Sequence, residues 1–294
     1  MTMPPASQFD ETPEERQDVA LSFDEPARWR KLPKKVWVGA AIVMVYVFVA
    51  LFAPLLAPHD PLMIDPVNKL ASPSADHLLG TDELGRDVFS RLLYAARVDI
   101  PIGFLGALLP AVLGTFLGAM AGFFGRWTDT IVMRTADVVQ AFPAYILVIV
   151  LVFALGQGAR SIVIAFTVLA WVVYARIIRS EVLRVKDLDY VHAARVAGLR
   201  PFRILRVHVF PNVINQTLVY LPSDIVFATL GLAAFSFLGL GIPPPTPEWG
   251  AMIADGQSFI RTNWWLATVP GLVIVGLGLG LSLVGEGLEE GLRS

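Results

Sequence analysis

The side chains that could carry out chemistry are few, and their spacing fits no catalytic motif. No H-E-x-x-H pattern and no grouping with carboxylates is evident for the four histidines, His59, His77, His192 and His208. Neither a G-x-x-x-x-G-K-S/T phosphate loop nor a G-x-S-x-G nucleophile motif is present. The lack of cysteine excludes disulfides, thiolate metal ligands and cysteine nucleophiles. The chain is therefore predicted to have no catalytic residues and no metal site.

The composition is that of a membrane protein. Of the 294 residues, 55% are hydrophobic and 16% are charged, whereas a soluble domain has about 45–50% and about 25%. The mean hydropathy of +0.62 agrees. Such a chain has too little polar surface to cover itself in water. A net charge of −2 provides no basic field for nucleic acid.

The apolar residues are concentrated in six runs of a length that can cross a bilayer. The runs cover residues 36–57, 100–124, 138–155, 161–178, 213–240 and 266–284. The short alternating segments of a membrane β-barrel are missing, so the predicted fold class is an all-α polytopic membrane protein with six transmembrane helices. Within the last run, Gly276, Gly278 and Gly280 are predicted to allow close helix packing rather than to bind phosphate.

The positive charges indicate the orientation in the membrane. Seventeen of the 23 Lys and Arg residues lie before the first run, after the second, around the segment between the fourth and fifth, or at the end. The positive-inside rule makes this side, with both termini, cytoplasmic. The predicted organisation is a tail and interfacial anchor (1–35), a first helix (36–57), an extracytoplasmic loop with an amphipathic helix (58–99), and a five-helix core (100–290).

The most informative polar segment is the cytoplasmic loop at 187–211. Asp189 is predicted to cap a helix over 190–197 that Gly198 ends. Pro201 then opens a second short helix, which Pro211 stops. The small pair Ala193 and Ala194 leaves one face able to enter a partner's groove. The alternative is a basic loop that merely obeys the positive-inside rule, and the residues alone leave both open.

The spacing in this loop resembles the E-A-A-x-x-x-G-x9-I-x-L-P signature of permease subunits in bacterial ABC importers. The positions that agree are Ala193, Ala194, Gly198 and Pro211, while His192, His208 and Phe210 replace Glu, Ile and Leu. In that family the segment is the coupling helix, which lies in a cleft of the ATP-hydrolysing subunit. The resemblance therefore implies ATPase-coupling roles for Asp189, Tyr190, His192, Ala193, Ala194, Arg195, Gly198 and Pro211.

Further segments are similar to the C-type permeases of the dipeptide/oligopeptide/nickel branch. They are 77–97, 133–137, 142–143, 236–241 and 244–250, within a resemblance that extends from about residue 28 to 290. It implies a type I ABC importer (MetI-like) permease fold in the cytoplasmic membrane of a prokaryote. The implied partners are a B-type permease, two ABC ATPase subunits that hold ATP and Mg, and an extracytoplasmic substrate-binding protein. No cofactor is expected in this chain.

Di- and oligopeptides are the expected cargo, with nickel, glutathione, haem or short oligosaccharides as alternatives. A secondary transporter would need midplane ion ligands and inverted repeats, and neither is evident. Asp224, beside Pro222 inside an apolar run, is the candidate residue of the translocation path. Its alternative role is a buried polar link to a neighbouring helix.

The outer loops supply candidate docking residues for the binding protein. These are Asp82, Arg86, Asp87, Glu248 and Trp249. Apolar residues between 84 and 96 share one helical face, which predicts an amphipathic helix along the outer membrane surface. That helix forms either part of the docking surface or a plug at the mouth of the bundle.

Overall fold

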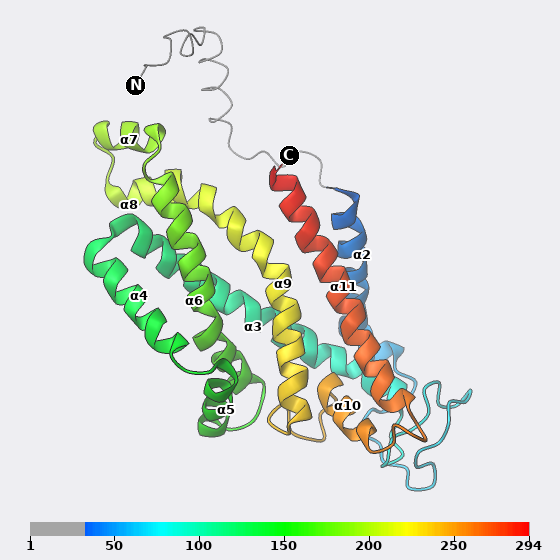
Figure 1. The fold of residues 1–294 in the computed structure, drawn as a ribbon. Coiled ribbons are helices and arrows are strands. Elements are labelled where there is room, and N and C mark those ends of the chain that lie inside the picture. The colour runs from blue at the N-terminus through cyan, green and yellow to red at the C-terminus, as the bar shows by residue number, and fades with distance from the viewer. Residues whose placement is uncertain (1–32, 294) are drawn as a thin grey trace, which may run out of the picture.

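The computed structural model describes residues 33–293. Within them the secondary structure is helical, apart from one isolated bridge between Thr81 and Asp87 (Figure 1). The predicted tail and the first part of the interfacial anchor lie outside the described residues. The fold class predicted from the apolar runs, an all-α membrane protein, is confirmed.

Among the described residues, 33–293, five helices are long and apolar enough to cross a membrane. They are α2 (Lys34–Leu56), α3 (Val88–Phe124), α6 (Ala159–Val185), α9 (Phe210–Phe237) and α11 (Trp265–Arg293). A sixth span exists only if α4 (Arg126–Gln140) and α5 (Ala144–Leu155), which are bent by 89° at their junction, are counted together. The described part of the chain therefore has five or six candidate spans.

The predicted third run, 138–155, straddles this bend. Pro143 precedes α5 and fixes its own φ, and it disfavours helical geometry at Phe142. The 12 residues of α5 extend only about 18 Å at 1.5 Å per residue, which is less than the hydrocarbon core of about 30 Å. A hydropathy window merges the apolar end of α4 with α5 and hides the break.

A single helix, α3, contains both the predicted outer helix and the predicted second span. It runs for 37 residues through Pro101 and Pro110. The prediction of a separate surface helix within 58–99 is wrong, because its apolar face meets protein instead of lipid. Val88, Leu92 and Ala96 are buried against Trp249 and Met252 of α10 (Trp249–Gln257) and against α11.

Small residues bring two pairs of helices into close contact. Along α3, Gly114 and Gly118 face the backbone of α6 at Trp171 and Ala175. Between α2 and α11, Gly280 receives Ile42 and Gly276 receives the ring of Tyr46. The predicted close packing is confirmed at Gly276 and Gly280, whereas a Cβ at Gly278 would meet only Val226 of α9, at an ordinary 3.6 Å. Ion pairs also hold α4 on α6, since Arg176 lies 2.9 Å from Asp137 and Arg179 pairs with Asp129.

The segments predicted to face the cytoplasm gather at one end of the bundle. There, α7 (Asp189–Val196) and α8 (Pro201–Ile204) lie at the same end as the start of α2 and the end of α11 (Figure 1). The connection between α2 and α3 lies at the opposite end with α10 (Figure 1). This arrangement separates the candidate coupling segment from the outer loops by the full length of the helices.

The contact between α3 and α6 generates the first prediction. Gly118→Ala places a Cβ 2.9 Å from the Cα of Ala175, and such overpacking costs about 1–3 kcal/mol. At Gly271 of α11 the added Cβ meets nothing within 4 Å, so Gly271→Ala stabilises its helix by up to about 1 kcal/mol. Thermal unfolding of the purified chain in detergent should show shifts of opposite sign. Equal shifts would contradict the close contact.

Candidate coupling and translocation sites

The helix α7 begins one residue earlier than predicted. Its N-cap is Leu188, whose carbonyl accepts the first helical bonds from Val191 and His192 at 3.0 and 3.1 Å. Asp189 is therefore not the cap, and its side chain makes no capping hydrogen bond. It lies in the first turn, where a negative charge is favourable beside the helix N-terminus.

Gly198 ends α7, as predicted. The N–H of Gly198 donates to the carbonyl of Arg195 at 3.0 Å, and the N–H of Leu199 donates to that of Ala194 at 3.2 Å. This pair of bonds is a Schellman motif, which requires left-handed geometry at the residue after the cap. Gly198 has φ of +75° with open space where a Cβ would stand. Glycine is needed here for backbone geometry and not for packing.

One face of α7 packs against the rest of its own chain. Val191 and Ala194 are buried in an apolar cluster with Ile178, Val182 and Val185 of α6. The prediction that Ala193 and Ala194 together form a docking face is wrong, since Ala193 is exposed and Ala194 is buried. Neighbouring residues on an α-helix point about 100° apart, so the two methyl groups face opposite surroundings.

The other face of α7 is exposed and weakly polar. It consists of His192, Ala193, Val196 and Ala197, and we call it the α7 outer face. Val196 is 89% exposed. Sequence reasoning missed Val196, although its spacing of four from His192 and three from Ala193 places all three on one side of a helix. The exposed side chains of Arg195, Arg200, Arg203 and Arg206 add positive charge at this end.

A hydrogen-bond network ties α7 to the start of α9. The Asn212 side-chain amide donates to the Tyr190 hydroxyl at 3.1 Å and to the His208 carbonyl at 2.7 Å. The Tyr190 hydroxyl donates to the same carbonyl at 3.3 Å. On α6, the Lys186 ammonium group donates to the carbonyl of Gly122 in α3 at 3.1 Å. These bonds therefore join α7 to the start of α9, and they join the end of α6 to α3.

Pro211 does not stop a helix, contrary to prediction. The chain continues from α8 through a π-helical turn, η2 (Leu205–Val209), directly into α9. Proline lacks an N–H and its ring displaces the carbonyl four residues earlier. The wider π turn before Pro211 accommodates both effects, so the helix continues. Helices α8 and α9 thus share one unbroken helical path, and Gly198 separates α7 from it.

Asp224 borders a cavity of 140 Å³ among three long helices. The cavity is lined by Gly106 and Ala107 of α3, by Phe166, Leu169 and Ala170 of α6, and by Asp224, Phe227 and Ala228 of α9. Asp224 is half-buried, and the buried phenol of Tyr174 lies close enough to influence its carboxylate, although the Tyr174 hydroxyl forms no hydrogen bond within the described residues. Both predicted roles for Asp224, in a translocation path or in a polar link, stay predictions.

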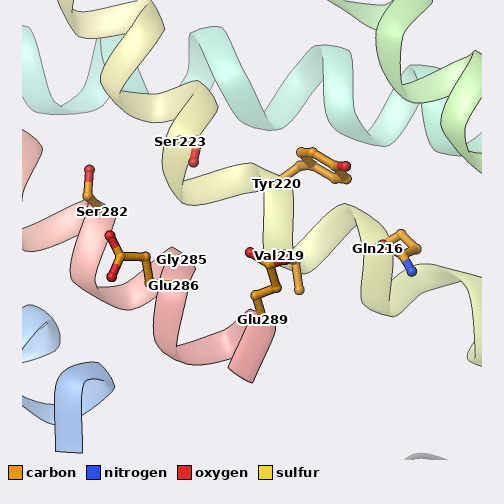
Figure 2. Close-up of a pocket in the computed structure, with 8 residues that line it drawn as sticks. All are labelled: Gln216, Val219, Tyr220, Ser223, Ser282, Gly285, Glu286 and Glu289. Carbon is orange, nitrogen blue, oxygen red and sulfur yellow. The ribbon is translucent and has the colours of Figure 1, made fainter. Parts of the chain in front are cut away.

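A larger polar cavity of 440 Å³ lies between α9 and α11 (Figure 2). Gln216, Tyr220 and Ser223 of α9 line one side, and Ser282, Glu286 and Glu289 of α11 line the other. Glu286 also lies 3.6 Å from the ammonium group of Lys35. Sequence reasoning missed these acids because they follow the last apolar run. The spacing of three residues between Glu286 and Glu289 places both on one side of a helix, and this was the signal available in the sequence.

The predicted docking residues at the outer end are buried. Asp82, Arg86, Asp87, Glu248 and Trp249 are all at most 8% exposed, so they offer no contact surface and the docking prediction is wrong. They have internal partners instead. Arg86 donates to Asp82 at 2.7 Å, Glu248 caps α10 at the N–H groups of Gly250 and Ala251, and the Trp249 indole donates to the carbonyl of Leu92 at 3.1 Å.

Two further carboxylates complete this outer cluster. Asp99 of α3 is fully buried and accepts a hydrogen bond from the Trp249 N–H at 3.2 Å. Because Asp99 directly precedes an apolar run, sequence reasoning assigned it to the loop. Burial raises the pKa of the Asp255 carboxyl in α10, while the charges of Arg91 and Arg86 oppose this rise. The outer ends of α3 and α10 are thus joined by buried polar contacts.

Comparison with known proteins identifies the family. Residues 114–294 match the family described as binding-protein-dependent transport system inner membrane component. Residues 34–73 match the N-terminal transmembrane domain of oligopeptide transport permease C. The solved structure of the MetNI methionine ABC transporter in inward-facing conformations has a TM-score of 0.53 at 16% identity, over 69% of this chain and 95% of that chain. It confirms the predicted MetI-like fold.

Relatives align over nearly the whole chain. A dipeptide transport system permease protein of Alkalihalophilus pseudofirmus is 35% identical, covering 95% of this chain and 92% of that protein. A di/tripeptide permease of Pseudomonas aeruginosa is 38% identical over 94% of each chain. An oligopeptide permease of Bacillus subtilis is 36% identical, over 94% and 90%. The chain therefore belongs to the inner-membrane components of binding-protein-dependent transport systems and is an ABC transporter permease of the dipeptide and oligopeptide permease C branch.

Proposed function

We propose that this permease imports di- and oligopeptides across the cytoplasmic membrane of a prokaryote, with both termini in the cytoplasm. The relatives' names support the cargo. The proposal that a separate ATPase subunit supplies the energy rests on the α7 outer face. An exposed apolar side chain on a short helix, held by burial of the opposite face, is suited to bind in a groove of another protein.

The transporter needs three further kinds of subunit in this proposal. A B-type permease packs beside this chain, so that one path runs between them. Two ABC ATPase subunits bind at the cytoplasmic end, one of them on α7, and they hold ATP and Mg. An extracytoplasmic binding protein delivers the peptide. This chain contributes no catalytic residue and no cofactor.

The contacts of α7 suggest how the chain responds to its ATPase. ATP binding closes the ATPase pair and displaces α7. Because Val191 and Ala194 are packed on α6 and α3, and because η2 continues into α9, the displacement moves long helices as bodies. Helix α9 carries Asp224, Ser223 and Tyr220 along the cavities. Its movement opens the path outward, and hydrolysis with product release restores the inward-open state.

The α7 outer face can be tested with a matched pair of substitutions. Val196 is 89% exposed on α7, and Val67 is 90% exposed in the outer loop. Burying an unpaired carboxylate in a partner's groove costs more than about 1.4 kcal/mol, so Val196→Glu should weaken ATPase association at least about tenfold. Val67→Glu should leave it unchanged. Co-purification of the ATPase subunits with each variant provides the measurement.

Peptide uptake by the same two variants adds a second readout. Val196→Glu should abolish uptake while membrane insertion stays normal, because the side chain at this position is 89% exposed in the isolated chain. Normal ATPase association and normal uptake by Val196→Glu would disprove docking through the α7 outer face.

Two variants can distinguish whether Asp224 contacts the transported peptide or forms a structural polar link to Tyr174. If the carboxylate attracts the ammonium group of a peptide, Asp224→Asn should reduce uptake at least about tenfold, the effect of about 1.4 kcal/mol lost from one charged contact. Tyr174→Phe removes only the hydroxyl and should retain uptake. Both variants should be compared at equal amounts of assembled transporter. Equal defects would favour the polar link, and full uptake by Asp224→Asn would exclude substrate contact.

A further inference from the structure

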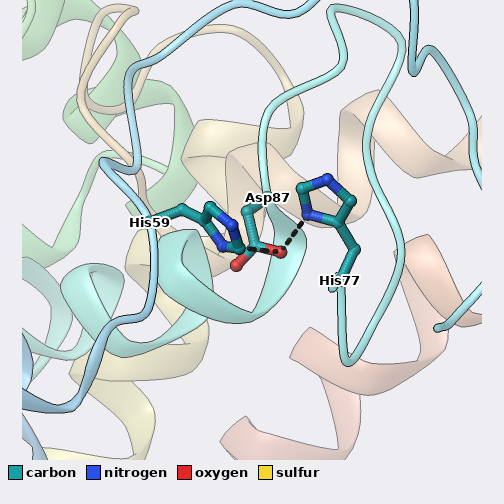
Figure 3. A group of neighbouring side chains, drawn as sticks. All are labelled: His59, His77 and Asp87. Carbon is teal, nitrogen blue, oxygen red and sulfur yellow. Dashed lines mark hydrogen bonds and ion pairs between the residues drawn. The ribbon is translucent and has the colours of Figure 1, made fainter. Parts of the chain in front are cut away.

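Three side chains with metal-binding atoms meet at the outer end of the molecule. They are His59, His77 and Asp87, and one ligand atom of each lies within 4.8 Å of the others (Figure 3). His77 Nδ1 lies 2.9 Å from Asp87 Oδ1, and His59 Nδ1 lies 3.8 Å from the same oxygen. The prediction that histidines do not group with carboxylates is wrong here. The grouping depends on the fold of the 57–87 connection, which residue spacing does not reveal.

The backbone holds each of these residues in place. Asp87 is the N-cap of α3, and its Oδ2 accepts from the Ser90 N–H at 2.8 Å while Oδ1 faces the histidines. The N–H of His59 donates to the Ser90 hydroxyl at 3.1 Å. The carbonyl of His77 accepts from Ser74 and Gly80, both at 2.8 Å. The group is therefore positioned before any ligand binds, which lowers the cost of binding.

One atom of the group is left without a partner. His59 Nδ1 is buried, and no hydrogen-bond partner reaches it within the described residues. A buried polar atom left unsatisfied costs about 1–3 kcal/mol. Asp87 is 2% exposed, so its carboxylate also lacks water. A cation between the three residues would satisfy His59 Nδ1 and neutralise the buried carboxylate together.

The spacing fits a tetrahedral cation. Zn²⁺ binds imidazole nitrogen and carboxylate oxygen at about 2.0–2.2 Å, so neighbouring ligand atoms around a tetrahedral ion lie about 3.4 Å apart. The two separations between histidine and Asp87, 2.9 and 3.8 Å, lie on either side of this value, and all three ligand atoms lie within 4.8 Å of one another. Two imidazoles and one carboxylate suit borderline transition metals such as Zn²⁺, Ni²⁺ and Co²⁺ better than Mg²⁺ or Ca²⁺.

We propose that His59, His77 and Asp87 form an extracytoplasmic binding site for a divalent transition-metal ion. The site joins the end of α2, the loop before α3 and the first residue ahead of α3. His59 also lines an open cavity of 550 Å³ beside Tyr94 and Pro247, through which a fourth ligand such as water reaches the ion. The bound ion fastens the 57–87 connection to the start of α3.

Calorimetric titration of the full-length chain with ZnCl₂ tests this proposal. The chain should be purified in detergent with an affinity tag that contains no histidine. We expect one Zn²⁺ per chain, and at least about tenfold weaker binding in His59→Gln, His77→Gln and Asp87→Asn, since even the outer partners of metal ligands contribute about 10–100-fold. Asn retains the capping ability of position 87, so the last variant keeps its fold.

The control is His208→Gln, at the opposite end of the molecule, which should bind Zn²⁺ as the unmodified chain does. X-ray absorption at the zinc edge should show imidazole nitrogens at about 2.0–2.1 Å. An excess of Mg²⁺ should not displace the ion. Zn²⁺ binding that is absent, or that is unchanged in all three site variants, would overturn the proposal and leave an ordinary His77–Asp87 pair.

Discussion

The close packing of α3 against α6 is the contact on which the other parts of the structure depend. Gly114 and Gly118 allow the two backbones to touch, so helices of 37 and 27 residues are aligned along much of their length. At one end α3 carries the buried outer cluster around Asp99 and Trp249. At the other end both helices supply the apolar bed on which α7 lies. The outer and inner functional regions are therefore attached to the same rigid pair.

This arrangement shows how, in the proposed function, displacement of so small a segment would move long helices. The buried face of α7 consists of the apolar side chains of Val191 and Ala194, and the α7 outer face consists of only four residues. Densely packed side chains transmit displacement because they have no free volume in which to yield. The π-helical turn before Pro211 and the Tyr190–Asn212 network add a second connection, directly to α9. In the proposed function, displacement of α7 would therefore reach α9 through this network and through the continuous helix formed by α8, η2 and α9.

The sequence allowed the fold class, the family and the end of α7 at Gly198 to be predicted, because long apolar runs, charge asymmetry and a left-handed glycine are local signals. The bend at Pro143 and the continuity through Pro211 depend on how neighbouring turns accommodate proline, which composition does not report. The buried state of Arg86 and Glu248 was missed because charged residues in a loop are usually exposed. The His59, His77 and Asp87 group forms only when the outer connection folds back on α3.

The central claim is that α7 presents one face to an ATPase while its other face is held by the permease. The chain has no cysteine, so single cysteines at Ala193 and Ala194 can be compared without background. Cross-linking to the ATPase subunits in the assembled transporter is the most direct measurement. Docking through the α7 outer face predicts a cross-link from Ala193→Cys, which is exposed, and none from Ala194→Cys, which faces α6. Equal cross-linking from both positions, or from neither, would contradict it.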